Sequence, residues 1–186
     1  MSHTSSKQAF LTMSAFLGLG AEDAQRLTAF FPRIEDRLPA ITDRFYALLG
    51  REEQLAHFLE GRLDDLKRTH LEWLRALFSG EYGEPFFERQ LVVGQVHVRI
   101  SLDSLWVDAV MNVLRRDLLA AILDVAGDET EALAVYGSLL KVMDLALMVI
   151  NFAYNEHRLK LIHQVTGMPE ALIERLIRVG VGGAKG

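Results

Sequence analysis

An all-α fold is predicted for this chain of 186 residues. Apolar residues recur at three- and four-residue spacing along most of the sequence, and no long segment alternates with the period of two that is typical of a half-buried strand. Proline is scarce, at 4 residues in the whole chain, which favours long helices. The length supports one domain with a sizeable hydrophobic core.

Glycine and proline mark the expected ends of the helices in the first half of the chain. Gly18 ends the first helix and Pro32 ends the second. Pro39 suits the first turn of the third helix, which Gly50 ends. Helices are therefore expected over residues 7–17, 21–31, 39–49 and 63–78, with a turn region at 57–61.

The second half of the chain is predicted to form three long helices and a short one. Ser101 or Asp103 is expected to cap the second of them. Asp128 and Glu131 form a capping-box pattern at the start of the longest. The four helices are expected at 84–100, 102–126, 128–165 and 170–179, and the final GVGGAKG is typical of a flexible tail or linker.

Composition excludes several kinds of partner and site. The net charge is −5 and no block of Lys and Arg exceeds two residues, so neither nucleic acid nor an anionic membrane surface is an expected partner. The absence of cysteine excludes disulfides, iron–sulfur clusters and thiolate zinc sites, and suits a cytoplasmic location. The most apolar stretch, residues 135–154, contains Lys141, Asp144 and Asn151, which predicts a buried helix and not a membrane span.

The sequence also lacks the short motifs of the common enzyme classes. There is no GxxxxGK[ST], GxGxxG, GxSxG or HExxH segment, so phosphate loops, dinucleotide sites, serine-hydrolase elbows and zinc-protease helices are not expected. The sequence contains no Glu-x-x-His segment, in which His follows Glu by three residues, and this argues against a di-iron helical bundle.

Among the six histidines, His97 has the most informative surroundings. It shares a helical stripe with Val93, Val96 and Ile100, and Gly94 permits a bulky group to approach closely. A neutral imidazole on such a stripe can be a metal ligand or an ordinary core residue. His70, among charged neighbours, is expected to be solvated or to form a hydrogen bond on the helix face.

Residues 66–106, LKRTHLEWLRALFSGEYGEPFFERQLVVGQVHVRISLDSLW, resemble the haem-binding centre of globin-coupled sensor domains and their protoglobin relatives. The shared elements are a helix that begins Leu-Lys-x-Thr, a Phe followed closely by Gly, and a His-x-Arg-Ile segment before a Trp. The resemblance covers residues 10–163 and implies a globin-like fold with an extra N-terminal helix and a long C-terminal helix. We accordingly divide the chain into an extension at 1–20, a haem domain at 21–166 and a C-terminal segment at 167–186.

The resemblance implies a b-type haem whose iron is bound by His97, the proximal ligand. It further implies that the Tyr46 phenol donates a hydrogen bond to bound dioxygen and that the Thr69 hydroxyl supports it. The implied apolar walls of the porphyrin pocket are Leu66, Phe58, Trp73, Val93, Val96 and Trp106. The sequence departs from the family pattern at Ser101, where glycine is usual, and at Ser104 and Val107, which puts the geometry of the turn after His97 in question.

The function implied is a haem-based sensor of dioxygen, carbon monoxide or nitric oxide, and not an enzyme. Family members transmit the ligand state to an output module or partner and dimerise through the last two long helices, here 102–126 and 128–165. Seven apolar residues on these helices are candidates for a homodimer seam: Leu118, Leu119, Ile122, Leu139, Val142, Leu145 and Val149. The alternatives are a haem-dependent enzyme, such as a nitric oxide dioxygenase or a peroxidase, and a haem-free helical interaction domain.

Overall fold

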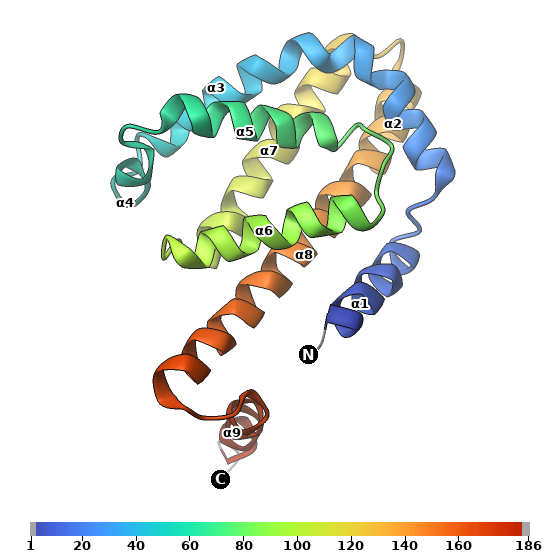
Figure 1. Ribbon diagram of the computed structural model, residues 1–186. Coiled ribbons are helices and arrows are strands. Elements are labelled where there is room, and N and C mark those ends of the chain that lie inside the picture. The colour runs from blue at the N-terminus through green and yellow to red at the C-terminus, as the bar shows by residue number, and fades with distance from the viewer. Residues whose placement is uncertain (1–2, 184–186) are drawn as a thin grey trace.

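The computed structural model describes residues 3–183, and every regular element in this range is helical, which confirms the all-α prediction (Figure 1). Two short 3₁₀ helices, Glu35–Arg37 and His57–Leu59, flank α3 and α4. The α-helices are α1 (His3–Phe16), α2 (Ala21–Ile34), α3 (Leu38–Leu49), α4 (Glu53–Ala56), α5 (Leu63–Ala76), α6 (Glu84–Arg99), α7 (Ser104–Val125), α8 (Glu129–Thr166) and α9 (Glu170–Gly183).

The long helix α8 is the centre of the fold, and α6, α7 and α2 pack against it. On the other side of the domain α3 packs against α5 and α7. Figure 1 shows α5 and α6 running in opposite directions, with α7 crossing behind them. One face of α5 lies opposite one face of α6 (Figure 1), and a hydrogen bond from Trp73 to Gln90 joins the two.

Gly94 lets α6 approach α8 closely. A Cβ atom at this position would lie 2.8 Å from Cβ of Ala153 and would overlap the carbonyl oxygen of Ile150. The flanking side chains of Leu91 and Val98 are buried on the same face of α6. The predicted close approach at Gly94 is therefore confirmed, and the group that approaches is the backbone of α8.

Replacement of Gly94 by alanine is expected to lower the free energy of unfolding by about 1–3 kcal/mol, because the added methyl group must push two helix backbones apart. Urea unfolding followed by circular dichroism measures the change. Gly137→Ala is the matched control, because a Cβ at Gly137 on α8 has no atom within 4 Å; there we expect no loss and a gain of up to about 1 kcal/mol. Equal stability of the two variants would contradict this account.

A buried charged cluster fixes α2 to α8. Asp23 accepts hydrogen bonds from Ser138 Oγ at 2.7 Å, from Lys141 Nζ at 3.0 Å and from the Gly20 backbone N–H at 3.0 Å. Burial alone would raise the pKa of this carboxyl group, but the donors around it hold the pKa below its usual value. Asp23 is therefore ionised at neutral pH and ties the start of α2 to the middle of α8.

Several helix boundaries differ from the prediction. α2 continues through Pro32 to Ile34, because the N–H that proline lacks falls in the last turn, where its loss breaks a single helical bond. The expected turn region at 57–61 begins with a 3₁₀ helix, His57–Leu59, and the short helix α4 precedes it. α9 continues to Gly183, into the predicted tail, and the last residues of that tail, 184–186, lie outside the described part of the chain.

The caps predicted for α7 and α8 are confirmed. Asp103 Oδ1 accepts a hydrogen bond from the Leu105 N–H at 2.8 Å, and Asp128 Oδ1 accepts one from the Glu131 N–H at 2.8 Å. The Glu131 carboxylate turns back to the N–H of Gly127. α8 ends at Gly167, whose φ of 70° lies in the left-handed region that favours glycine.

Most of the apolar residues predicted to form a homodimer seam lie in the core of the single chain. Their assignment to the seam was wrong. Leu119 is half-buried, whereas the six others are buried within the domain: Leu118, Ile122, Leu139, Val142, Leu145 and Val149.

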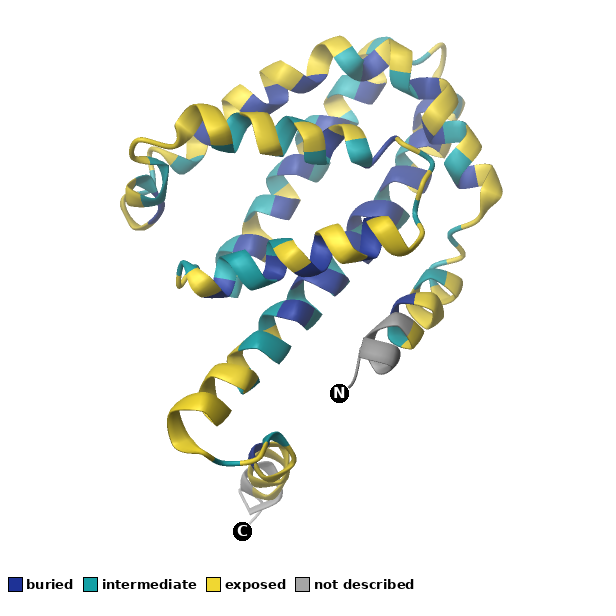
Figure 2. Cartoon of the chain, in the orientation of Figure 1, coloured by how far each residue is buried: buried dark blue, intermediate teal, exposed yellow. Residues whose placement is uncertain are grey.

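The helix α8 is long and apolar enough to span a membrane by length and composition, but half of its most apolar window is buried inside the domain. Figure 2 shows the buried first part of α8 and its exposed C-terminal end.

Candidate cofactor site

The face of α6 beside its contact with α8 carries His97 in a row of half-buried apolar residues. Val93, Val96 and Ile100 lie within one turn of His97 on the same side of the helix. None of these side chains is fully covered by the protein, in contrast to Leu91 and the other residues facing α8. The stripe predicted from the sequence therefore exists, and it is only partly covered by the protein.

The His97 ring is half-buried and one of its nitrogens has no partner. Nδ1 is buried without a hydrogen bond to any atom of the described residues. Burial lowers the pKa of His97 to about 4, so the imidazole is neutral at pH 7 and keeps a free lone pair. A neutral imidazole with an unpartnered nitrogen in apolar surroundings can bind a metal ion or a metal-containing cofactor.

Across from α6, the helices α3 and α5 present an aromatic cluster. Tyr46 is buried, and its hydroxyl donates a hydrogen bond to the carbonyl oxygen of Leu66 on α5 at 3.0 Å. Its ring meets that of Phe45 edge-on, with 5.1 Å between centroids. Burial raises the pKa of Tyr46 to about 12, so the phenol stays protonated and remains a hydrogen-bond donor.

His70 belongs to this cluster, although no role in a site was predicted for it from the sequence. Its ring stacks on Phe45 with 4.4 Å between centroids, and Nδ1 lies 3.0 Å from Thr42 Oγ1 on α3. Nε2 is buried and has no partner among the described residues. Burial lowers the pKa of His70 to about 4, so this imidazole is neutral as well.

The spacing of α5 contained the signal that identifies His70. His70 lies four residues after Leu66, and Trp73 and Leu74 lie three and four residues after His70, which places them on one side of the helix. The charged neighbours that suggested a solvated histidine lie on the other sides of α5, where side chains such as that of Arg68 pair with Asp65 and Glu72.

Thr69 does not join the cluster. Its side chain is exposed, and its hydroxyl bonds to the carbonyl oxygens of Asp65 and Leu66 in its own helix, at 3.1 and 3.0 Å. The expected distal role of Thr69 is therefore not supported, because the residue that faces the interior at this point of α5 is its neighbour, His70.

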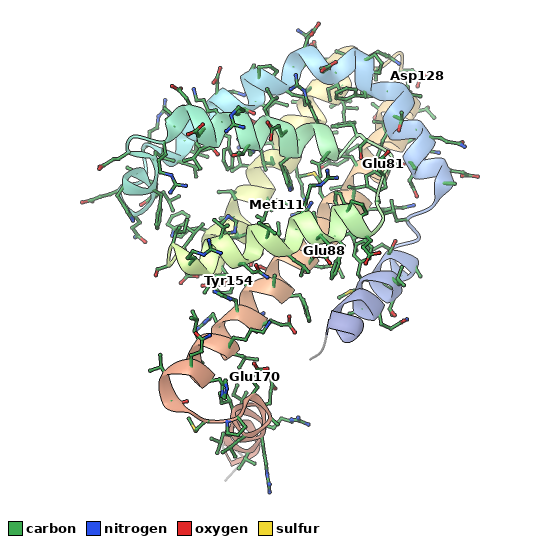
Figure 3. All side chains as sticks on the ribbon, in the orientation of Figure 1. Glu81, Glu88, Met111, Asp128, Tyr154 and Glu170 are labelled. Carbon is green, nitrogen blue, oxygen red and sulfur yellow. The ribbon has the colours of Figure 1, made fainter. Side chains whose placement is uncertain are left out.

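The six apolar residues expected to line the pocket share one property, which is incomplete burial. Leu66, Phe58, Trp73, Val93, Val96 and Trp106 are all half-buried, and they come from the 3₁₀ helix after α4 and from α5, α6 and α7. The buried Met111 of α7 is seen between α5 and α6 in Figure 3. These elements leave apolar side-chain surface that a flat, largely apolar cofactor can cover.

A hydrogen bond joins the two facing helices. Trp73 Nε1 on α5 donates to Gln90 Oε1 on α6 at 2.9 Å, and Gln90 is buried. His97 follows Gln90 by seven residues, about two helical turns, and so lies on the same side of α6. The bond therefore fixes which face of α5 looks toward the face of α6 that bears His97.

Comparison with known proteins agrees with this geometry. The family model of protoglobin matches residues 6–160. The chain belongs to the protoglobin family. Its fold is similar to the globin domain of a globin-coupled sensor from Geobacter sulfurreducens, with a TM-score of 0.73, 30% identity, and coverage of 77% of this chain and 96% of that one.

A second solved structure shows the same fold at lower identity. The ferrous globin domain of E. coli DosC matches with a TM-score of 0.61 and 20% identity, covering 79% of this chain and 98% of that chain. No curated protein sequence matches this chain significantly. The globin-like fold with an added N-terminal helix and a long C-terminal helix is thereby confirmed.

The turn after His97 explains the glycine usual in protoglobin relatives. Ser101 has a φ of 58°, in the left-handed region that side chains other than glycine rarely adopt. The turn is held by hydrogen bonds from Leu102 N–H to the His97 carbonyl and from Ser101 N–H to the Val98 carbonyl, each 2.9 Å. Ser101 therefore holds a backbone conformation that favours glycine, at the cost of local strain.

We expect Ser101→Gly to raise the free energy of unfolding of the protoglobin domain by about 0.5–1 kcal/mol, because glycine adopts this conformation without steric cost. Chemical denaturation measures the gain. Ser101→Ala keeps the Cβ atom and its strain, so it should bring no gain. If alanine stabilised the domain as much as glycine, the serine hydroxyl and not the backbone conformation would be the cause of the strain.

Proposed function

We propose that this protoglobin domain binds haem b between α5 and α6, with His97 as the proximal ligand of the iron. The observation that carries the proposal is the His97 ring, which is neutral, half-buried and has an unpartnered buried nitrogen beside apolar residues that remain partly uncovered. Histidine is the usual proximal ligand of haem in globins. The unpartnered nitrogen and the incomplete burial of Val93 and Val96 both fit a bound porphyrin.

The role of the chain's residues is to hold the haem and to set the polarity beside it. Haem iron supplies reversible binding of O2, CO or NO. Tyr46 keeps a protonated phenol inside the domain, and its present acceptor is the backbone carbonyl of Leu66. To donate to a gas ligand, the hydroxyl must leave this carbonyl, so the structure supports a distal donor that changes partner when a ligand binds.

Hemin titration of the purified protein tests the haem proposal. We expect stoichiometric uptake, and after reduction a Soret band that shifts with both air and CO, because a neutral imidazole is available to bind the iron. His97→Ala should abolish or strongly alter this band. His57→Ala is the matched control, because His57 is exposed, and it should leave the spectrum unchanged.

Two results would contradict the proposal in different ways. Failure of the protein to bind haem would return His97 to the core and favour a haem-free helical interaction domain. Normal spectra in the His97→Ala variant would keep the haem and remove its assigned ligand.

We infer a sensing role in the cytoplasm, with the ligand state passed on by the helices. α6 connects the proposed ligand His97 to the central helix α8 through the contact at Gly94. A displacement of α6 on gas binding would therefore reach α8 and the α9 segment that packs against its end. An output module or a separate partner would receive this displacement.

A homodimer through α7 and α8 is part of the proposal, and exposed leucines support it. Leu105 and Leu123 on α7 are 70% and 51% exposed, and Leu133 on α8 is 57% exposed. Burial of such side chains against a second copy is favourable. These residues replace the seven that the sequence suggested.

Sedimentation at tens of micromolar protein is expected to give twice the chain mass of 20.9 kDa. Leu133→Glu should shift the equilibrium toward the monomer, because it places a charge on the proposed seam. Val92→Glu is the control, since Val92 is 56% exposed and lies on α6, which is not part of the proposed seam. A strict monomer in the unmodified protein would exclude the dimer.

A further inference from the structure

We propose that His70 is a second, internal ligand of the haem iron, so that the domain without gas is held by His97 from α6 and by His70 from α5. The inference rests on the proposed haem function and adds to it a competition: O2, CO or NO must displace a side chain of the protein in order to bind. Four observations carry it.

The first observation is the division of roles between the two nitrogens of the His70 ring. Nδ1 lies 3.0 Å from the Thr42 hydroxyl, whereas Nε2 is buried without a partner. An unpartnered buried N–H is rarer in proteins than an unpartnered acceptor, so we assign the hydrogen to Nδ1, which donates to Thr42. Nε2 then carries a free lone pair, the state that a metal ligand requires.

The second observation is that this hydrogen bond is the kind that orients metal-binding histidines. A ligating imidazole commonly donates its other N–H to an oxygen of the protein, which fixes both the tautomer and the direction of the ring. Thr42 is buried on α3, and its hydroxyl serves this purpose for His70.

The third observation is the confinement of the ring. Phe45 stacks on it at an interplanar angle of 9°, Tyr46 meets it nearly edge-on at 5.6 Å between centroids, and Trp73 lies at 6.2 Å. These aromatic contacts give Nε2 no polar neighbour. A ring that is held this firmly with one nitrogen unsatisfied is disfavoured unless that nitrogen binds something.

The fourth observation is the position of His70 relative to His97. The hydrogen bond from Trp73 to Gln90 joins the facing sides of α5 and α6, and the two helices run in opposite directions (Figure 1). His70 precedes Trp73 by three residues, roughly 5 Å along α5, and His97 follows Gln90 by seven residues, roughly 10 Å along α6. Because the helices are antiparallel, both histidines lie on the same side of this bond, on opposing faces.

The consequence is a gas affinity set in part by the protein's own side chain. A ligand that must displace His70 sees only the fraction of molecules in which the iron is free on that side, and its apparent affinity falls by that fraction. Release of His70 from the iron also removes a link between α5 and α6, so gas binding would alter the contact between these helices. Tyr46, which touches His70, is placed to respond.

The test uses the haem-loaded full chain in its ferric form. We expect electron paramagnetic resonance and visible spectra typical of low-spin iron with two imidazole ligands, and pulsed measurements on 15N-histidine-labelled protein should count two axial imidazoles. His70→Leu should convert the spectrum to high-spin and raise the rate of CO binding to the reduced protein by on the order of tenfold or more. His57→Leu, at an exposed histidine, is the control and should change neither.

The outcomes separate this inference from the proposal on which it rests. Haem uptake with a single axial imidazole in the unmodified protein, or a His70→Leu variant with unchanged spectrum and CO rate, would overturn the role of His70 and leave His97 as the ligand. Absence of haem uptake would overturn both. The imidazole count needs no variant, so the inference stays testable if His70→Leu does not fold.

Discussion

The contact between α6 and α8 at Gly94 determines where the proposed site lies. Because no side chain separates the two backbones there, α6 presses Leu91 and Val98 onto α8, and the rotation of the helix about its own axis is fixed. This rotation turns Gln90 and His97 toward α5 and not toward solvent or the core. The helix opposite is α5, against which α3 packs, and α7 crosses behind both α5 and α6 in Figure 1.

Polar atoms without partners are concentrated where α5 and α6 face each other. Of the four buried side-chain nitrogen and oxygen atoms without a hydrogen bond among the described residues, three belong to His70, His97 and Gln90. Each such atom costs about 1–3 kcal/mol when it remains unsatisfied. The Asp23 cluster, which lies between α2 and α8, shows the opposite pattern, because Ser138, Lys141 and the Gly20 N–H all donate to the carboxylate. The buried charge of Asp23 is therefore paired, whereas polar atoms beside the proposed haem are not.

Periodicity and capping residues were sufficient to predict the long helices, because their apolar stripes and end signals are local. The stripe that bears His97 was predictable for the same reason. His70 was not identified, because more weight was given to its charged sequence neighbours than to the three- and four-residue spacing that places it beside Leu66 and Trp73. The face of α8 that the core would cover was also not predictable, which is why Leu139 and Val142 were mistaken for a dimer seam. The error on α8 concerns packing between helices, which sequence spacing does not encode.

A crystal structure of the haem-loaded protein tests the central claim most directly. The account predicts a porphyrin between α5 and α6, in contact with Leu66, Val93 and Val96, with a ring nitrogen of His97 bonded to the iron. A haem bound elsewhere on the domain, or held there by a residue other than His97 on the α6 side, would contradict it.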